Sequence, residues 1–148
     1  MMLIARLVHI LGFTVWIGGM FFAYMALRPA AAVVQPPQRL QLWEGVLGKF
    51  FFWVWLAVAL IFASGFHMVA LLGRPAAYVM AMMGLGIVML LIFAYIFFMP
   101  YKDLQRAVAA QDWPAGGAAL ARVGGLVRTN LILGLLTLCL GVVGPLLG

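Results

Sequence analysis

The chain has 148 residues, of which 68% are hydrophobic and 8% charged, and its mean hydropathy is +1.19. Water-soluble domains are about 45–50% apolar and about 25% charged, so this composition excludes an ordinary soluble fold. Only three acidic residues are present, which leaves little material for catalysis by paired carboxylates. The sequence predicts one integral membrane domain over residues 1–148.

The formal charge is +6, but the basic residues flank apolar runs instead of gathering on one polar face. Membrane proteins use Lys and Arg in this way, so the charge does not indicate a nucleic-acid partner. The single cysteine, Cys139, excludes an internal disulfide and a C-x-x-C site.

Four apolar runs are long enough to cross a bilayer, which requires about 20 residues in a helix. They cover residues 3–27, 50–72, 76–99 and 129–147. We therefore expect an all-α integral membrane protein with four transmembrane helices in an up-down bundle. Residues 28–49 and 100–128 form the two longer connections, and their apolar spacing after Pro37 and Trp113 predicts helical extensions of the spans.

The charges predict the orientation. The side of the two longer connections carries seven basic residues: Arg28, Arg39, Lys49, Lys102, Arg106, Arg122 and Arg128. The opposite side carries Arg6 and Arg74 alone. The positive-inside rule places the seven-base side in the cytoplasm, so both termini of a bacterial inner-membrane protein would be periplasmic.

Ionisable groups inside a membrane are costly, which makes His9 and His67 candidate functional residues. Counted from the ends of their spans at 1.5 Å per residue, they lie roughly 9 Å and 7.5 Å below the outer boundary. We therefore expect the two histidines at one depth on consecutive antiparallel helices. His9 shares a stripe with Gly12, Trp16 and Gly19, and His67 shares one with Leu60, Ser64 and Leu71.

The fourth span carries a seam of small and polar residues that recurs every three or four positions: Asn130, Gly134, Thr137, Gly141 and Gly144. Small residues let helices approach closely in a membrane, so this seam predicts a packing surface. We expect Asn130 to form a hydrogen bond to a neighbouring helix. The same seam could equally serve a homodimer.

Two opposed histidines can supply both axial ligands of haem b, and imidazole nitrogen suits iron. In this first hypothesis His9 and His67 bind the iron, Arg6 and Arg74 pair with the propionates, and Trp16 packs on the macrocycle. The protein would transfer electrons or oxidise a small or quinone-like reductant, and as an enzyme it would be a haem-dependent membrane oxidoreductase. Covalent c-type attachment is excluded because no C-x-x-C-H occurs.

Copper is the alternative occupant, since thioethers and imidazoles both bind it. The chain has ten methionines, and Met68, Met80 and Met83 lie in the outer parts of the second and third spans. His9 and His67 together with these methionines would then form a copper site for resistance or uptake. In a third hypothesis the bundle holds no cofactor and both histidines only pack.

Two segments resemble the CopD family of bacterial inner-membrane proteins, whose copper-resistance members are called copper resistance protein D. One runs from Leu7-Val8-His9-Ile10 to Val15-Trp16-Ile17-Gly18-Gly19-Met20, and the other covers residues 122–134 with Arg128-Thr129-Asn130-Leu131. The family is similar to the wider group of four-helix membrane b-type cytochromes and to HemJ-type proteins. The resemblance implies a metal or haem role for His9.

Overall fold

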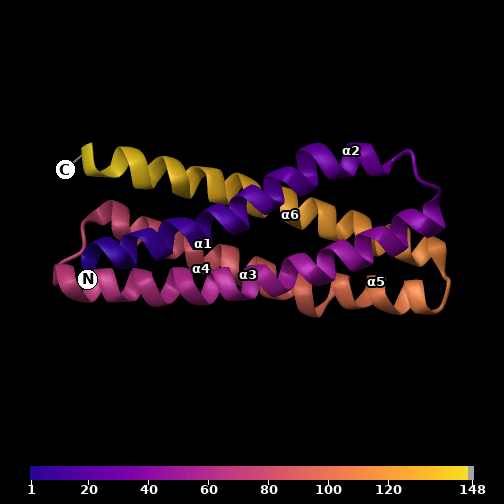
Figure 1. Ribbon diagram of the computed structural model, residues 1–148, viewed down its shortest axis with the longest axis horizontal. Coiled ribbons are helices and arrows are strands. Elements are labelled where there is room, and N and C mark those ends of the chain that lie inside the picture. Colours follow the sequence, from indigo (N-terminus) through magenta and orange to yellow (C-terminus); the bar gives the residue numbers. More distant parts are fainter. Residues whose placement is uncertain (147–148) are drawn as a thin grey trace.

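Four helical rods run side by side along the molecule, which confirms the predicted all-α bundle with four long apolar helices (Figure 1). The computed structural model describes residues 1–146, so Leu147, the last residue of the fourth predicted span, lies outside the described residues. The elements in chain order are α1 (Met2–Phe22), η1 (Ala23–Leu27), α2 (Arg28–Ala31), α3 (Pro36–Leu72), α4 (Ala77–Phe98), α5 (Pro100–Ala109), α6 (Trp113–Val143) and η2 (Gly144–Leu146).

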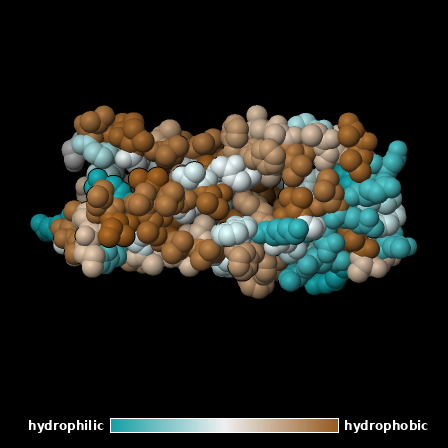
Figure 2. Space-filling model, viewed as in Figure 1, coloured by the Kyte–Doolittle hydropathy of each residue, from teal (hydrophilic) through white to brown (hydrophobic). Residues whose placement is uncertain are grey.

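The start of α1 and the end of η2 lie at the same end of the bundle (Figure 1). We call the half with the termini the terminal half, and the half with α2, α5 and the starts of α3 and α6 the basic half. The seven basic residues predicted on one side all belong to segments of the basic half. Hydrophilic side chains gather at that end, whereas most of the remaining surface is apolar (Figure 2). This surface is suited to a bilayer, and the chain is a multi-pass membrane protein.

The first rod contains one π-helical turn, η1, between α1 and α2. The amide of Arg28 donates to the carbonyl of Ala23, five residues earlier. Pro29 follows directly, and a proline both lacks an amide hydrogen and crowds the carbonyl four residues before it. Widening the turn to the π register relieves this crowding, and such turns are common at functional sites.

The two longer connections are mostly helical, as predicted. α3 is a continuous helix of 37 residues that begins at Pro36, where the missing amide hydrogen costs nothing, and ends at Gly73 with a φ of 71°. The third rod breaks at Met99 and Pro100, and α6 starts after a sharp turn. The carboxylate of Asp112 caps α6 by accepting a hydrogen bond from the Ala115 amide at 3.1 Å.

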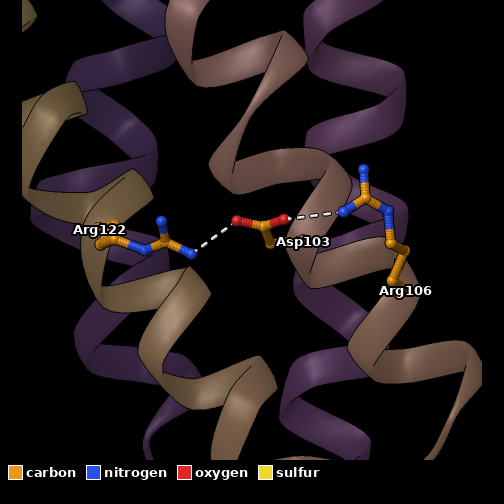
Figure 3. A network of polar contacts seen from close by, with 3 residues as sticks. All are labelled: Asp103, Arg106 and Arg122. Carbon is orange, nitrogen blue, oxygen red and sulfur yellow. Dashed lines mark hydrogen bonds and ion pairs between the residues drawn. The ribbon is translucent and has the colours of Figure 1, made fainter.

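Asp103 forms both of the ion pairs found among residues 1–146, and one of them joins α5 to α6 (Figure 3). Asp103 on α5 lies 2.7 Å from the guanidinium of Arg122 on α6 and 3.1 Å from that of Arg106 on its own helix. The three side chains are partly or largely exposed, so each pair adds about 1 kcal/mol or less. The pair with Arg122 is therefore a weak polar link between α5 and α6.

Large aromatic side chains form the centre of the bundle. Phe51 of α3 is 1% exposed and packs edge-to-face on Phe93 at 5.4 Å and on Tyr101 at 5.0 Å between ring centroids. Trp55 packs on Phe93 in the same way at 4.8 Å. These rings hold α3 against α4 and α5, and we call them, together with Phe97, the aromatic core.

The predicted seam on the last helix is a packing surface. Asn130, Gly134, Thr137 and Gly144 are buried, and Gly141 is half-buried. A Cβ atom at Gly134 would collide with Ile17 of α1, and one at Gly144 would collide with Tyr78. The amide nitrogen of Asn130 donates to the Met89 carbonyl at 3.2 Å, which confirms the expected hydrogen bond between helices.

Candidate metal centre in the terminal half

His9 is anchored to the neighbouring helix by one ring nitrogen. Its Nδ1 lies 2.9 Å from the backbone oxygen of Ile61 and 3.1 Å from Oγ of Ser64, both on α3. A carbonyl oxygen can only accept, so Nδ1 carries the proton and donates it. In the neutral ring Nε2 is then unprotonated, and its lone pair is free to bind a metal.

Ser64 supports this arrangement from α3. Its hydroxyl donates to backbone carbonyls of its own helix, those of Leu60 and Ile61, so its oxygen is left to accept from His9. Metal-binding histidines commonly donate their second ring N–H to a carbonyl or a carboxylate, which fixes the ring orientation. His9 already has such a partner.

Two glycines make the close approach of α1 and α3 possible. A Cβ atom at Gly12 would lie 3.1 Å from the Ala57 carbonyl oxygen and 3.0 Å from the Ile61 side chain. A Cβ atom at Gly65 would lie 3.2 Å from Cε1 of His9. The imidazole thus rests on bare backbone, in the manner of small-residue contacts between membrane helices.

His67 lies farther toward the termini than His9. It follows Ser64 by three residues, which is roughly 4.5 Å along a helix, so the expectation of equal depth is wrong by about one turn. The predicted inward stripe on this helix is also wrong except at Ser64, because Leu60, His67 and Leu71 are exposed. The buried row runs through Ala57, Ile61 and Ser64 instead.

A hollow of about 290 Å³ lies beside His67, between the first turns of α1 and the end of α3. Ser64 lines it as well, so this serine contacts His9 on one side and the hollow on the other. The thioether residue Met1 belongs to the same lining. Nothing in the sequence marks Met1 as a candidate ligand, and only the packing of the first helical turn brings it to the hollow.

The geometry does not fit a haem clamped between His9 and His67. Two axial imidazoles must reach the iron from opposite faces of a porphyrin, which requires a gap between the helices that carry them. At the level of His9 there is no gap, since its ring bonds the backbone of α3 and Gly12 packs against Ala57. The haem hypothesis in this form finds no support in the structure.

The other residues predicted to bind the haem, Arg6, Arg74 and Trp16, do not share one environment. Arg6 and Arg74 are exposed, and neither forms an ion pair within residues 1–146. Trp16 is 2% exposed and packs edge-to-face on Phe93 at 6.2 Å. Its ring therefore joins α1 to the aromatic core.

The predicted methionine ligands divide into two groups. Met68 is half-buried and lies one turn after Ser64, on the face of α3 that meets α1. Met80 and Met83 belong to α4, which packs on α6, and no residue of α4 lines the hollow beside His67. No cluster of three or more His, Cys, Asp or Glu side chains occurs in the described part of the chain.

A family model described as CopD, copper resistance protein D, matches residues 44–144. This match covers more than half of the chain, so the protein belongs to the CopD family. The matched region includes His67, Met68 and the α6 segment noted for its resemblance, but it begins after the helix that carries His9. No curated protein and no solved structure matches the chain.

Proposed function

We propose that this CopD family membrane protein binds copper, as Cu(I), in the terminal half of the bundle. The observation that supports the proposal best is the anchored imidazole of His9, whose Nδ1 proton is held by Ile61 and Ser64. This hydrogen bonding presents the Nε2 lone pair in a fixed direction before any metal arrives.

The available donors favour copper over zinc. Structural and catalytic zinc sites use three or four His, Cys or carboxylate ligands, and the described residues hold no such group. Two imidazoles and nearby thioethers form a soft, low-coordinate set that suits Cu(I). In this proposal His9 and His67 supply nitrogen, and Met68 and Met1 supply sulfur.

We also propose that the terminal half faces the periplasm. Seven basic residues belong to the other half, and the positive-inside rule assigns such a half to the cytoplasm. Copper would then be bound near the outer membrane surface. A reporter fused after Gly148 that works only in the periplasm should be active, and a cytoplasmic reporter at that position should be silent.

Competition for Cu(I) tests the binding site. The purified protein in lipid nanodiscs is titrated, under anaerobic reducing conditions, against a coloured Cu(I) chelator. We expect one Cu(I) per chain and an affinity at least tenfold weaker in His9→Gln and in His67→Gln. Met68→Leu should weaken binding, whereas Met99→Leu, on an exposed methionine in the basic half, should leave it unchanged.

Thermal unfolding of the metal-free variants completes the test. Equal Cu(I) affinity in the wild type and both histidine variants would contradict the proposal. A His9→Gln variant that binds less copper but also melts far below the wild type would be replaced by His9→Asn, whose side-chain amide nitrogen can take the place of Nδ1 and keep the hydrogen bond to Ile61.

A further inference from the structure

A second cavity lies in the basic half, and none of its lining residues belongs to the hollow beside His67. It has a volume of about 360 Å³ and lies between the first rod, the start of α3 and the first half of α6. Its walls are mostly apolar and aromatic, including Tyr24, Trp43 and Trp113. Tyrosine and tryptophan prefer the headgroup level of a bilayer, where an apolar body meets a polar edge.

Two arginines, Arg28 and Arg39, line the same cavity. The guanidinium of Arg28 lies 4.9 Å from the centre of the Tyr24 ring, which holds its charge at the cavity wall. No acidic residue belongs to the lining. Of the three acids in the chain, Asp103 binds Arg106 and Arg122, Asp112 caps α6, and Glu44 lies outside the lining and forms no ion pair within residues 1–146. Arg28 and Arg39 therefore have no acidic partner among the described residues.

We propose that this cavity binds an anionic phospholipid, with the lipid phosphate between Arg28 and Arg39 and part of an acyl chain against the apolar wall. The two arginines flank the turn that leads from the first rod into α3, where the apolar surface gives way to hydrophilic residues (Figure 2). Basic pockets between membrane helices at this depth are suited to anionic headgroups. The apolar wall favours a lipid over free phosphate, which needs no hydrocarbon contact.

The π-helical turn contributes to the shape of this site. η1 lies just before Pro29 and carries Ala23 and Tyr24, both in the lining. On the opposite wall Gly117 and Gly124 of α6 leave open space, since a Cβ atom at either would meet no atom within 4 Å. Larger side chains at these positions would fill the cavity without colliding with the backbone.

Native mass spectrometry of the delipidated protein in neutral detergent tests the proposal. The probes are phosphatidylglycerol, phosphatidylcholine with the same chains, glycerol phosphate and inorganic phosphate. We expect phosphatidylglycerol to bind at least tenfold more tightly than phosphatidylcholine. We expect no competition from the two water-soluble phosphates. The double variant Arg28→Gln/Arg39→Gln should bind phosphatidylglycerol about 25-fold more weakly, at about a fivefold loss for each basic residue removed.

Two matched controls separate a defined site from general surface charge. Lys49→Gln/Arg128→Gln removes the same charge from exposed positions in the basic half that do not line the cavity, and it should bind like the wild type. Gly124→Leu should weaken lipid binding by filling the cavity. Gly125→Leu, with equal free space but outside the lining, should not.

Equal losses in the two charge variants would overturn the proposal, and so would equal binding of both phospholipids. Competition by inorganic phosphate as strong as by phosphatidylglycerol would overturn the assignment to a lipid and leave a free-anion site. Every variant is compared after its melting temperature has been shown to equal that of the wild type.

Discussion

The contact of His9 with α3 and the aromatic core join helices in opposite ways. Around His9, α1 and α3 meet through glycine and a histidine–backbone hydrogen bond. In the aromatic core, α3 is separated from α4 and α5 by layers of large rings. At the first contact, small side chains let the helices approach until a hydrogen bond orients one imidazole. In the aromatic core, large side chains fill the space between the helices. In our proposal the first contact orients a metal ligand, whereas the aromatic core stabilises the fold.

Truncation in the aromatic core should have the largest effect on stability. Phe51→Ala should lower the free energy of unfolding by about 2–3 kcal/mol, less than is typical of a soluble core, because apolar groups are equally well solvated by lipid. Unfolding in mixed detergent micelles measures it. Phe52→Ala, at a neighbouring ring that is 66% exposed, should change stability by less than about 0.5 kcal/mol. Equal losses would remove the contrast between core and lipid-facing rings.

The second largest effect on stability should come from adding volume at Gly12, where α1 and α3 meet most closely. Gly12→Ala places a methyl group about 3 Å from the Ala57 carbonyl, which is backbone and cannot rotate away. We expect a loss of about 1–3 kcal/mol and weaker Cu(I) binding, because α1 must move away from α3. Gly18→Ala, where a Cβ atom meets nothing within 4 Å, should leave both properties unchanged. A neutral Gly12→Ala would show that the approach of the two helices is not required.

Removing the serine partner of His9 should affect the metal more than the fold. Ser64→Ala leaves the Ile61 carbonyl as the one partner of Nδ1, and we expect about a tenfold loss of Cu(I) affinity with little change in melting temperature. Thr14→Ala removes a hydroxyl on α1 that bonds only its own helix, and it serves as the control. Unchanged affinity in Ser64→Ala would mean that the serine has no role in orienting the ring.

Removing the Asp103 ion pairs should have the smallest effect on the free energy of unfolding. Asp103→Asn removes the charge that pairs with Arg106 and Arg122 at the surface, and we expect a loss of about 1 kcal/mol or less. The loss should shrink further in high salt, because exposed charges are screened. Unfolding at low and high ionic strength measures both. A loss as large as that of Phe51→Ala would contradict the view that packing, and not charge, holds this bundle together.

The sequence was sufficient to predict the bundle and one of its packing surfaces. Each rod has a long apolar run, and the bilayer fixes how many residues such a run needs. The Asn130 seam was predictable because glycine, asparagine and threonine stand out among leucines and repeat every three or four residues. The helical extensions were predictable from the apolar spacing after Pro37 and Trp113.

The rotation of each helix was harder to predict. In a membrane protein the lipid-facing side chains are as apolar as the buried ones, so no polar face marks the outside. His67 and Met68 are adjacent in the sequence, yet the histidine side chain is exposed and the methionine side chain is half-buried. The Ile61 carbonyl could not be predicted as the partner of His9, because every residue has a backbone carbonyl. Met1 lines the hollow because of how the first turn of α1 packs, which the sequence pattern does not predict.

X-ray absorption at the copper edge tests the copper site most directly, on nanodisc protein loaded with one Cu(I) per chain. We predict imidazole nitrogen together with thioether sulfur around the metal. The imidazole signal should fall in His9→Gln, and the sulfur signal should fall in Met68→Leu. Copper surrounded only by light atoms, with the same spectrum in the wild type and in His9→Gln, would contradict a site built on the anchored histidine.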